Sequence, residues 1–538
     1  QLNHERVALT SAAPLMHSVA QVREWAQHTK NPDGTRVIDA EWVQVLLGRA
    51  HARVDMLKLL NWQLASATED LSPADASATK VYGSEMATEV YRSLMEVVGP
   101  LATVHGNSPG AVLRGRLERY YRSSLVMTFG GGTNEIQRDI IGYVGLPAGG
   151  EAMSTETSTA DLSGDDMDFA LTPEAIDAAA LAATILADQC TSERLRAAET
   201  TAGRFDRELW RHLGEAGLLA LAVPEQHGGS DLGMLEVCSV LVEAGRKVAP
   251  VPVAAHVVAA MALVRFGNPE QQAHWLPQAA TGARVLTCAV SEEREHAPDQ
   301  PTTLAHRTED GWVLSGAKTA VPAGVAADLF VVPATTEVGT ALFLIEAGDP
   351  GVAVISQELS GRESVAHLVL DGAALPPDRL LGKPGEAGAT SIWLTQHLTV
   401  ALCAEQVGTL EGALALTADY AKTREQFGRA IGTFQAVSQR LADGYIDVLG
   451  ARLTLWQAAW KLSERLPAAA DVATAKLWAA DAGHRVAHTT VHVHGGVGID
   501  LDGDAHRYFT AAKRHEFFLG GTTDQSRAIG RLLAGQQG

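Results

Sequence analysis

Hydrophobic positions recur every three or four residues through residues 1–147, which predicts a set of amphipathic helices. The same spacing returns in residues 168–283 and again in residues 383–538. Between these segments, residues 284–382 hold short β-branched or alternating runs separated by Gly, Pro and Asp, which predicts strands and turns. We therefore expect a mostly α-helical protein with one β-domain.

Residues 148–167 break this pattern because they are small and polar, with almost no large apolar side chain. Such a segment cannot bury enough surface to fold alone, so we interpret it as a linker. It separates a helical bundle (1–147) from a second unit, which consists of a helical domain (168–283), a β-domain (284–382) and another helical bundle (383–538).

The two helical bundles resemble each other in sequence. Lys80 and Lys476 each precede a glycine by 19 residues, at Gly99 and Gly495. Three further matches keep the same order: Trp62-Gln63 with Trp456-Gln457, Arg119-Tyr120-Tyr121 with Arg507-Tyr508-Phe509, and Gly131-Gly132-Thr133-Asn134 with Gly520-Gly521-Thr522-Thr523. Shared order and near-equal spacing predict a duplicated unit whose first copy lacks its front two-thirds. Since the sequence starts at Gln1 and not at Met, we interpret the chain as trimmed or incompletely represented at its start.

Charge and cysteine content narrow the function classes. The 43 basic and 63 acidic side chains give a net charge of −20, so we expect no nucleic-acid partner and no anionic membrane surface. Four widely spaced cysteines without a CxxC pair indicate a reduced compartment, which we take to be the cytoplasm, and no apolar run is long enough for membrane insertion. His484, His488 and His492 share one helix face but span about 12 Å, too far for one ion, so we expect no metal.

The second unit also contains a series of motifs in a fixed order. They are Trp210-x-x-Leu213-x-x-x-Gly217-Leu218, Val223-Pro224-Glu225-Gln226-His227-Gly228-Gly229, Asp310-Gly311-Trp312-Val313-Leu314-Ser315-Gly316, Thr423-Arg424-x-x-Phe427-Gly428-x-x-Ile431-x-x-Phe434-Gln435 and Val493-His494-Gly495-Gly496-Val497-Gly498. The first copy adds Gly131-Gly132-Thr133-Asn134-Glu135-Ile136-Gln137-Arg138. Together these motifs resemble the acyl-CoA dehydrogenase family. The resemblance implies a helical domain, a β-barrel domain and a four-helix-bundle C-terminal domain, preceded here by an extra C-terminal-type bundle.

Paired unequal copies are similar to the bacterial acyl-CoA dehydrogenases that shorten steroid side chains. The resemblance implies α,β-desaturation of a bulky, steroid-like acyl-CoA, with FAD as hydride acceptor and a carboxylate as base. The family carries its base glutamate at one of two places. Gly131 and Gly520 occupy the first place in the two copies, whereas Glu5 occupies the second place in the first copy. Glu5 is therefore the candidate base, and a solvated helix glutamate is the alternative.

The resemblance also implies that FAD lies between the two copies. The residues that match the family's cofactor positions are Arg424, Phe427, Gln435, His492, Gly495 and Gly496 in the second copy, and Thr133 and Glu135 in the first. A forked Arg424 could pair with the pyrophosphate, and the two glycines could let the backbone approach the dinucleotide. His492 replaces the family's usual glutamine. The alternative for the first-copy loop is an ordinary helix cap, with Thr133 at the N-cap.

The reverse site, with the copies exchanged, looks inactive. Ser291–Glu295 and Val321–Gly324 replace the family's flavin-binding segments, and Asn31–Arg36 replaces the Arg-x-x-Phe-Gly segment. We therefore expect one FAD per fused pair, and weak FAD binding if the molecule truly begins at Gln1. The resemblance further implies an acyl-CoA substrate, an electron-transfer flavoprotein as acceptor and a homodimer of fused chains. The alternative function is a catalytically silent scaffold.

Overall fold

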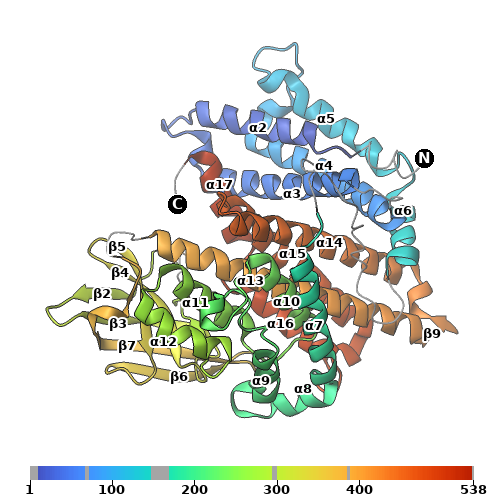
Figure 1. The fold of residues 1–538 in the computed structure, drawn as a ribbon. Helices are drawn as coiled ribbons and strands as arrows, with labels where there is room; N and C mark the ends of the chain where they lie inside the picture. Colours follow the sequence, from blue (N-terminus) through green and yellow to red (C-terminus); the bar gives the residue numbers. More distant parts are fainter. Residues whose placement is uncertain (1–9, 67–71, 147–168, 294–299, 384–387, 536–538) are drawn as a thin grey trace.

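The computed structural model describes residues 10–66, 72–146, 169–293, 300–383 and 388–535. The predicted linker 148–167 and the candidate base Glu5 lie outside the described residues. Helices form most of the described chain, and one β-domain lies at a side of the molecule (Figure 1), so the predicted fold class is confirmed. In the described ranges no helix is both long and apolar enough to cross a bilayer.

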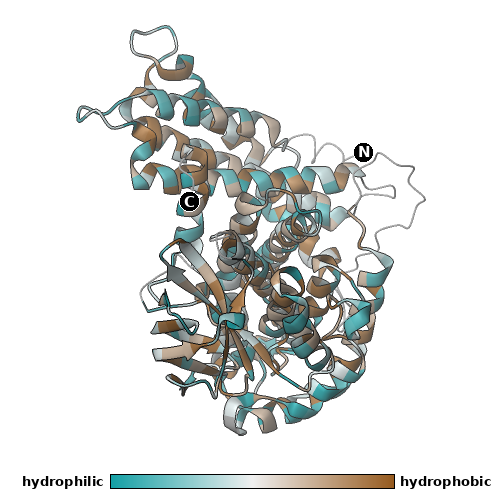
Figure 2. Cartoon of the chain, turned by 60° about the vertical axis from the view of Figure 1, so that its left-hand side comes forward, coloured by the Kyte–Doolittle hydropathy of each residue, from teal (hydrophilic) through white to brown (hydrophobic). Residues whose placement is uncertain are grey.

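The first bundle occupies the upper part of Figure 1. Its helices are α2 (Ala13–His28), α3 (Glu41–Ser66), α4 (Pro73–Val98), α5 (Arg116–Ser124) and α6 (Asn134–Ile140). Helix α4 begins where Ser72 accepts a hydrogen bond from the N–H of Asp75 and Pro73 opens the first turn, and it ends at Gly99 with a φ of 72°. Figure 2 shows polar and apolar faces along these helices, as the sequence spacing predicts.

The second unit opens with six helices. They are α7 (Pro173–Gln189), α8 (Ser192–Glu199), α9 (Arg207–Glu215), α10 (Met234–Arg246), α11 (Val253–Phe266) and α12 (Pro269–Ala280). Helices α10 and α11 are buried along most of their length because both pack against the long helix α13 (Ala389–Thr423). This packing joins the front helices of the second unit to its C-terminal bundle.

The β-domain is one eight-stranded sheet in the order β6-β7-β3-β2-β4-β5-β8, with β1 paired to β4. Its strands are β1 (Leu286–Cys288), β2 (Leu304–Arg307), β3 (Trp312–Pro322), β4 (Leu329–Thr336), β5 (Gly339–Glu346), β6 (Val352–Glu358), β7 (Ser364–Leu375) and β8 (Leu380–Leu381). Most pairings are antiparallel, and β1 and β2 pair with β4 in parallel. Helix α11 packs on β1, which fixes the sheet against the helical domain.

The second bundle contains α13, α14 (Gln435–Ser463), α15 (Ala469–His494), α16 (Ala505–Phe517) and α17 (Thr522–Ala534). A two-stranded hairpin of β9 (Glu425–Gln426) and β10 (Arg429–Ala430) lies between α13 and α14. The elements of this bundle follow the same order as those of the first, so α3, α4, α5 and α6 correspond to α14, α15, α16 and α17.

Buried lysines mark this correspondence. Lys80 on α4 donates from Nζ to the backbone oxygens of Thr128 and Gly132 at 3.2 and 2.7 Å. Lys476 on α15 donates to the oxygens of His515 and Glu516 at 2.6 and 3.1 Å. In both bundles the lysine therefore ties the third long helix to the chain just before the last helix. This conserved geometry within one chain supports the duplication inferred from sequence.

The two bundles pack by exchanging their last helices. Helix α17 lies on α3, and α6 lies on α14. Gly48 permits the first contact, because a Cβ atom there would overlap the backbone oxygen of Ser526. Arg527 forms an ion pair with Glu41 at 2.6 Å across the α17–α3 contact, and Arg138 forms one with Asp443 at 2.7 Å across the α6–α14 contact. The two arginines hold equivalent positions, because each follows the first glycine of its repeat, Gly520 or Gly131, by seven residues. The bundles thus form a pseudo-symmetric pair.

Candidate functional site

A cavity of 540 Å³ lies where α13 ends and α15 meets the following turn. Three of the residues that line it are the predicted cofactor residues Arg424, Gly495 and Gly496. Although 70 residues separate Arg424 from the glycine pair, Arg424 follows the end of α13 and Gly495 follows the end of α15, and these two helix ends meet at the cavity. The remaining lining residues are Tyr420, Gln426, Ile431, Val493, His494, Val497 and Asp500.

The backbone around Arg424 is fixed, whereas its side chain is exposed. The Arg424 N–H donates to Tyr420 O at 2.8 Å, and the Ile431 N–H donates to Arg424 O at 2.8 Å. In the part of the chain that the structure describes, Arg424 forms no ion pair. A guanidinium at a cavity edge that is not already ion-paired can bind an anionic ligand such as a phosphate in bidentate fashion.

Gly495 and Gly496 expose backbone to the same cavity. Gly495 ends α15 with a φ of 64°, a region that favours glycine, and a Cβ atom at either glycine would meet no atom within 4 Å. Behind this turn, the rings of Tyr420 and His494 stack with centroids 4.3 Å apart. Burial lowers the pKa of His494, so its ring is neutral and forms an uncharged wall. The sequence motif contains His494 but gave no sign of this stacking.

The other second-copy residues predicted to bind the cofactor do not line this cavity. Phe427 lies at the tip of the β9–β10 hairpin, with a φ of 53° and a side chain that is 93% exposed. His492 is exposed near the end of α15. Gln435 begins α14, and its Nε2 donates to Asp139 Oδ2 at 3.3 Å. The last contact joins a predicted cofactor residue of the second copy to the first copy.

Thr133 and Glu135 lie at the start of α6, the helix that carries Asp139. The Thr133 hydroxyl caps this helix by accepting a hydrogen bond from the Ile136 N–H at 3.5 Å, which is the local role that sequence offered as the alternative. Hydrogen bonds from its own backbone N–H and from the Thr133 hydroxyl hold the pKa of the exposed Glu135 below its usual value. These residues therefore lie on the element that contacts Gln435.

Sequence reasoning missed the contacts that hold the first-copy loop in place. Buried Asn134 accepts a 2.6 Å hydrogen bond from Lys80 Nζ, and its amide donates to Glu85 at 2.9 Å. Arg138 bonds the same Glu85 at 2.8 and 2.9 Å. The repeated lysine was the available signal, because it pointed to Lys80, but the acceptor set could not be read from spacing.

In the reverse site, Glu292 lies inside the protein rather than at its surface. Its carboxylate accepts hydrogen bonds from Lys318 Nζ at 2.6 Å and from the hydroxyls of Thr302 and Thr303 at 2.5 and 2.6 Å. Burial acts to raise the pKa of Glu292, but Lys318 and the two hydroxyls outweigh it and lower the pKa to about 2. In the same segment Glu293 is exposed, whereas Arg294 and Glu295 lie outside the described residues.

Two family profiles match the sequence. The profile described as "Acyl-CoA dehydrogenase, C-terminal domain" matches residues 1–146 and again 390–533, and "Acyl-CoA dehydrogenase, N-terminal domain" matches residues 172–283. The C-terminal profile thus occurs twice in one chain, which agrees with the duplication seen in the bundles.

Two curated relatives match stretches of different length. Acyl-CoA dehydrogenase FadE27 of Mycobacterium tuberculosis is 51% identical over 377 residues, which cover 68% of this chain and 99% of the relative. Acyl-CoA dehydrogenase FadE26 of the same organism is 62% identical over 151 residues, which cover 27% of this chain and only 38% of that relative.

Two solved structures align with about two thirds of this chain. A chain of the ChsE4-ChsE5 complex from Mycobacterium tuberculosis aligns with a TM-score of 0.66 and 51% identity, covering 69% of this chain and all of that chain. A variant of the Tcur3481-Tcur3483 steroid ACAD aligns with a TM-score of 0.64 and 40% identity, covering 67% of this chain and 98% of the other.

Proposed function

This chain belongs to the acyl-CoA dehydrogenase family of FAD-dependent oxidoreductases, and from that premise we propose that it desaturates a bulky, steroid-like acyl-CoA thioester at its α and β carbons. The observation that carries the proposal is the cavity that unites Arg424 with Gly495 and Gly496. The bulky substrate class is proposed from the likeness to a steroid ACAD.

The described residues fit one half of a dinucleotide site. Arg424 offers a cation without a described carboxylate partner, and the open backbone of Gly495 and Gly496 allows close approach of a phosphate-linked group. Phe427, with its exposed ring at the hairpin tip, is available to cover a nucleotide base. FAD, when bound, supplies the hydride acceptor. His492 and Gln435 are proposed to border the same cofactor.

The first copy is proposed to supply the remaining half. Thr133 and Glu135 lie at the start of α6, the helix that contacts Gln435 through Asp139 near its other end. Glu5 is proposed to remove the α proton of the thioester, because neither Gly131 nor Gly520 can act as base. One FAD per chain follows from this arrangement, because in the reverse site the segment that replaces a flavin-binding segment holds Glu292 in a buried ion pair with Lys318.

Further proposals concern partners and location. We propose an electron-transfer flavoprotein as electron acceptor and a homodimer of chains, in which four bundles reproduce a dimer of dimers. A cytoplasmic location agrees with the cysteines, because all four are buried and none forms a disulfide.

The test is visible absorbance of the native protein during anaerobic addition of steroid and straight-chain acyl-CoAs. We expect a yellow protein whose flavin band bleaches with a steroid acyl-CoA. Arg424→Ala should lower FAD retention sharply, whereas Glu5→Gln should abolish turnover and spare FAD. Normal turnover by the Glu5→Gln protein would remove Glu5 as the base. A native protein that stays colourless and does not take up FAD would favour the silent scaffold.

A further inference from the structure

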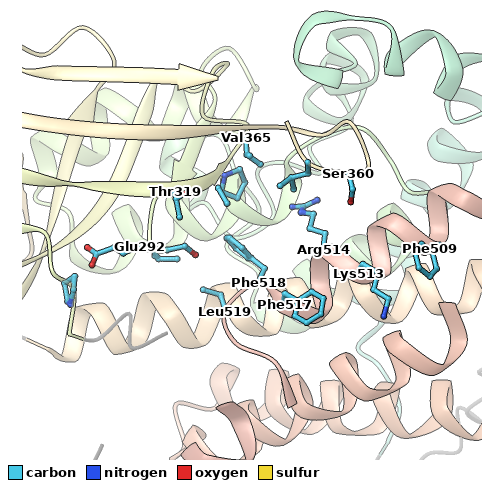
Figure 3. A pocket seen from close by; sticks show the side chains of 16 residues that line it. Glu292, Thr319, Ser360, Val365, Phe509, Lys513, Arg514, Phe517, Phe518 and Leu519 are labelled. Atoms are coloured by element: carbon cyan, nitrogen blue, oxygen red, sulfur yellow. The ribbon is translucent and has the colours of Figure 1, made fainter. Parts of the chain in front are cut away.

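A second cavity, of 610 Å³, opens between the β-domain and helix α16 (Figure 3). Its β-domain wall is apolar apart from a few hydroxyls and Glu292, and its opposite wall consists of aromatic and basic side chains from α16 and the residues after it. The volume lies within the usual range of small-molecule sites, which is about 300–1,000 Å³. The predicted cofactor residues do not line this cavity.

The β-domain wall fits a flavin ring poorly because its polar groups already bond one another. The Thr319 N–H donates to Ser291 O at 2.9 Å, and the Ala320 N–H donates to Gln357 Oε1 at 3.0 Å. The Glu292 carboxylate is saturated by Lys318 and two threonines. A ring with a polar edge would leave its own acceptors without partners here, which is costly in a buried site.

The opposite wall offers a cation together with aromatic rings. Arg514 reaches from α16 toward the β-domain side of the cavity, with Phe517 and Phe518 near it (Figure 3). Within the described ranges the carboxylate recorded nearest to Arg514 is that of Glu363, at 3.7 Å, and Glu363 also faces Arg204 at 3.6 Å. Arg514 also interacts electrostatically with buried Glu405, but its recorded ion pair with Glu363 is a long one.

The neighbouring cation is better satisfied. Lys513 Nζ bonds Glu516 at 2.7 Å and lies 2.8 Å from His484 Nδ1, so it has less capacity for a new anion. Phe517, by contrast, is an aromatic side chain that is 64% exposed and lines the cavity. The cavity thus combines one available guanidinium with an aromatic surface that folding leaves uncovered.

We propose that this cavity binds an apolar carboxylic acid, with the carboxylate on Arg514 and the apolar body between Phe517, Phe518 and the β-domain. A guanidinium fork matches the two oxygens of a carboxylate, and flat aromatic rings suit a rigid multi-ring body. The site is distinct from the proposed cofactor cavity and does not depend on bound flavin. It gives the second copy a ligand of its own after the loss of a flavin site.

Isothermal titration calorimetry of the native protein with deoxycholate, below its micelle-forming concentration, tests the proposal. We expect saturable binding of one molecule per chain. Arg514→Gln should weaken deoxycholate binding about tenfold or more, because a hydrogen-bonded charge pair is lost. Deoxycholate methyl ester, which lacks the carboxylate, should bind the unaltered protein as weakly as deoxycholate binds the Arg514→Gln protein. Phe517→Ser, a change at an exposed position, should weaken binding without affecting the fold. Phe129→Ser is the matched control, because Phe129 is 60% exposed in the first bundle and does not line the cavity, so binding should not change.

Three results would overturn the proposal. The first is deoxycholate binding that does not saturate. The second is binding to the Arg514→Gln and Phe517→Ser proteins that is as strong as binding to the unaltered protein. Displacement of deoxycholate by FAD or by a steroid acyl-CoA would place it at a flavin or substrate site instead. Because the readout is heat of binding and not turnover, the result stands apart from the test of dehydrogenase activity.

Discussion

Arg138 should stabilise helix α6 much more than its repeat equivalent Arg527 stabilises α17. The Arg138 side chain is only 15% exposed and bonds two carboxylates, Glu85 at 2.8 and 2.9 Å and Asp443 at 2.7 Å. Among the described residues, Arg527 has a recorded ion pair with Glu41 alone, and Glu41 is 65% exposed. The same residue at the same repeat position therefore has two different environments.

The expected magnitudes follow from these contacts. A hydrogen bond to a charged group contributes about 1.5–3 kcal/mol, but Glu85 and Asp443 are about half exposed and regain water, so we expect Arg138→Met to cost roughly 2–3 kcal/mol. The surface pair of Arg527 should contribute about 0–1 kcal/mol. The difference of about 2 kcal/mol corresponds to roughly a thirtyfold change in a local opening equilibrium.

Hydrogen exchange read by mass spectrometry measures this difference. Peptides from α6 should exchange roughly thirtyfold faster in the Arg138→Met protein, while α17 peptides should change little in the Arg527→Met protein. Faster opening of α6 should also lower FAD retention, since this helix begins with Thr133 and Glu135. Equal effects of the two substitutions on their helices would refute the reasoning from burial and partner number.

Further substitutions test the supporting contacts. Lys80→Met should raise exchange in the loop around Gly132 and lower FAD affinity. Lys476→Met should raise exchange around His515 and Glu516, which do not line the proposed FAD cavity, and should lower FAD affinity less than Lys80→Met does; equal losses of FAD in the two proteins would contradict the assignment of the first-copy loop. Gly495→Val should weaken FAD binding by placing a strained side chain in the cavity, and unaltered FAD affinity in a folded protein would argue against that cavity. The lowered pKa of Glu292 means that its ion pair stabilises the fold above the ordinary carboxyl pKa of 4.5. This contribution is lost as the pH falls from 4.5 toward about 2. Glu292→Gln should therefore destabilise the protein at pH 7 and flatten this part of its acid-unfolding curve, and an unchanged curve would contradict the assignment.

The sequence predicted the elements of this fold better than their contacts. Apolar spacing located the helical segments and the strand region because each element must bury one face. The repeated Lys80 and Lys476 located equivalent points in the two bundles. Thr133 was correctly weighed as a helix cap, since capping depends on a few neighbouring residues.

Contacts between distant residues could not be predicted in this way. Arg138 and Asp443 lie 305 positions apart, and no local pattern pairs them. The sequence marked Glu292 only as part of a segment that replaces a flavin-binding segment, because its burial against Lys318 depends on how β3 passes the preceding loop. Arg424 and Gly495, which line one cavity, could be assigned to a common site from sequence only through the family resemblance, because their spacing does not connect them.

The ratio of FAD to polypeptide in the native protein tests the composite site most directly. Absorbance of flavin released by denaturation, set against protein concentration, should give one FAD per chain, and a steroid acyl-CoA should bleach all of it under anaerobic conditions. Two FAD molecules per chain, or a bound flavin that no acyl-CoA bleaches, would contradict a single redox site shared by the two copies.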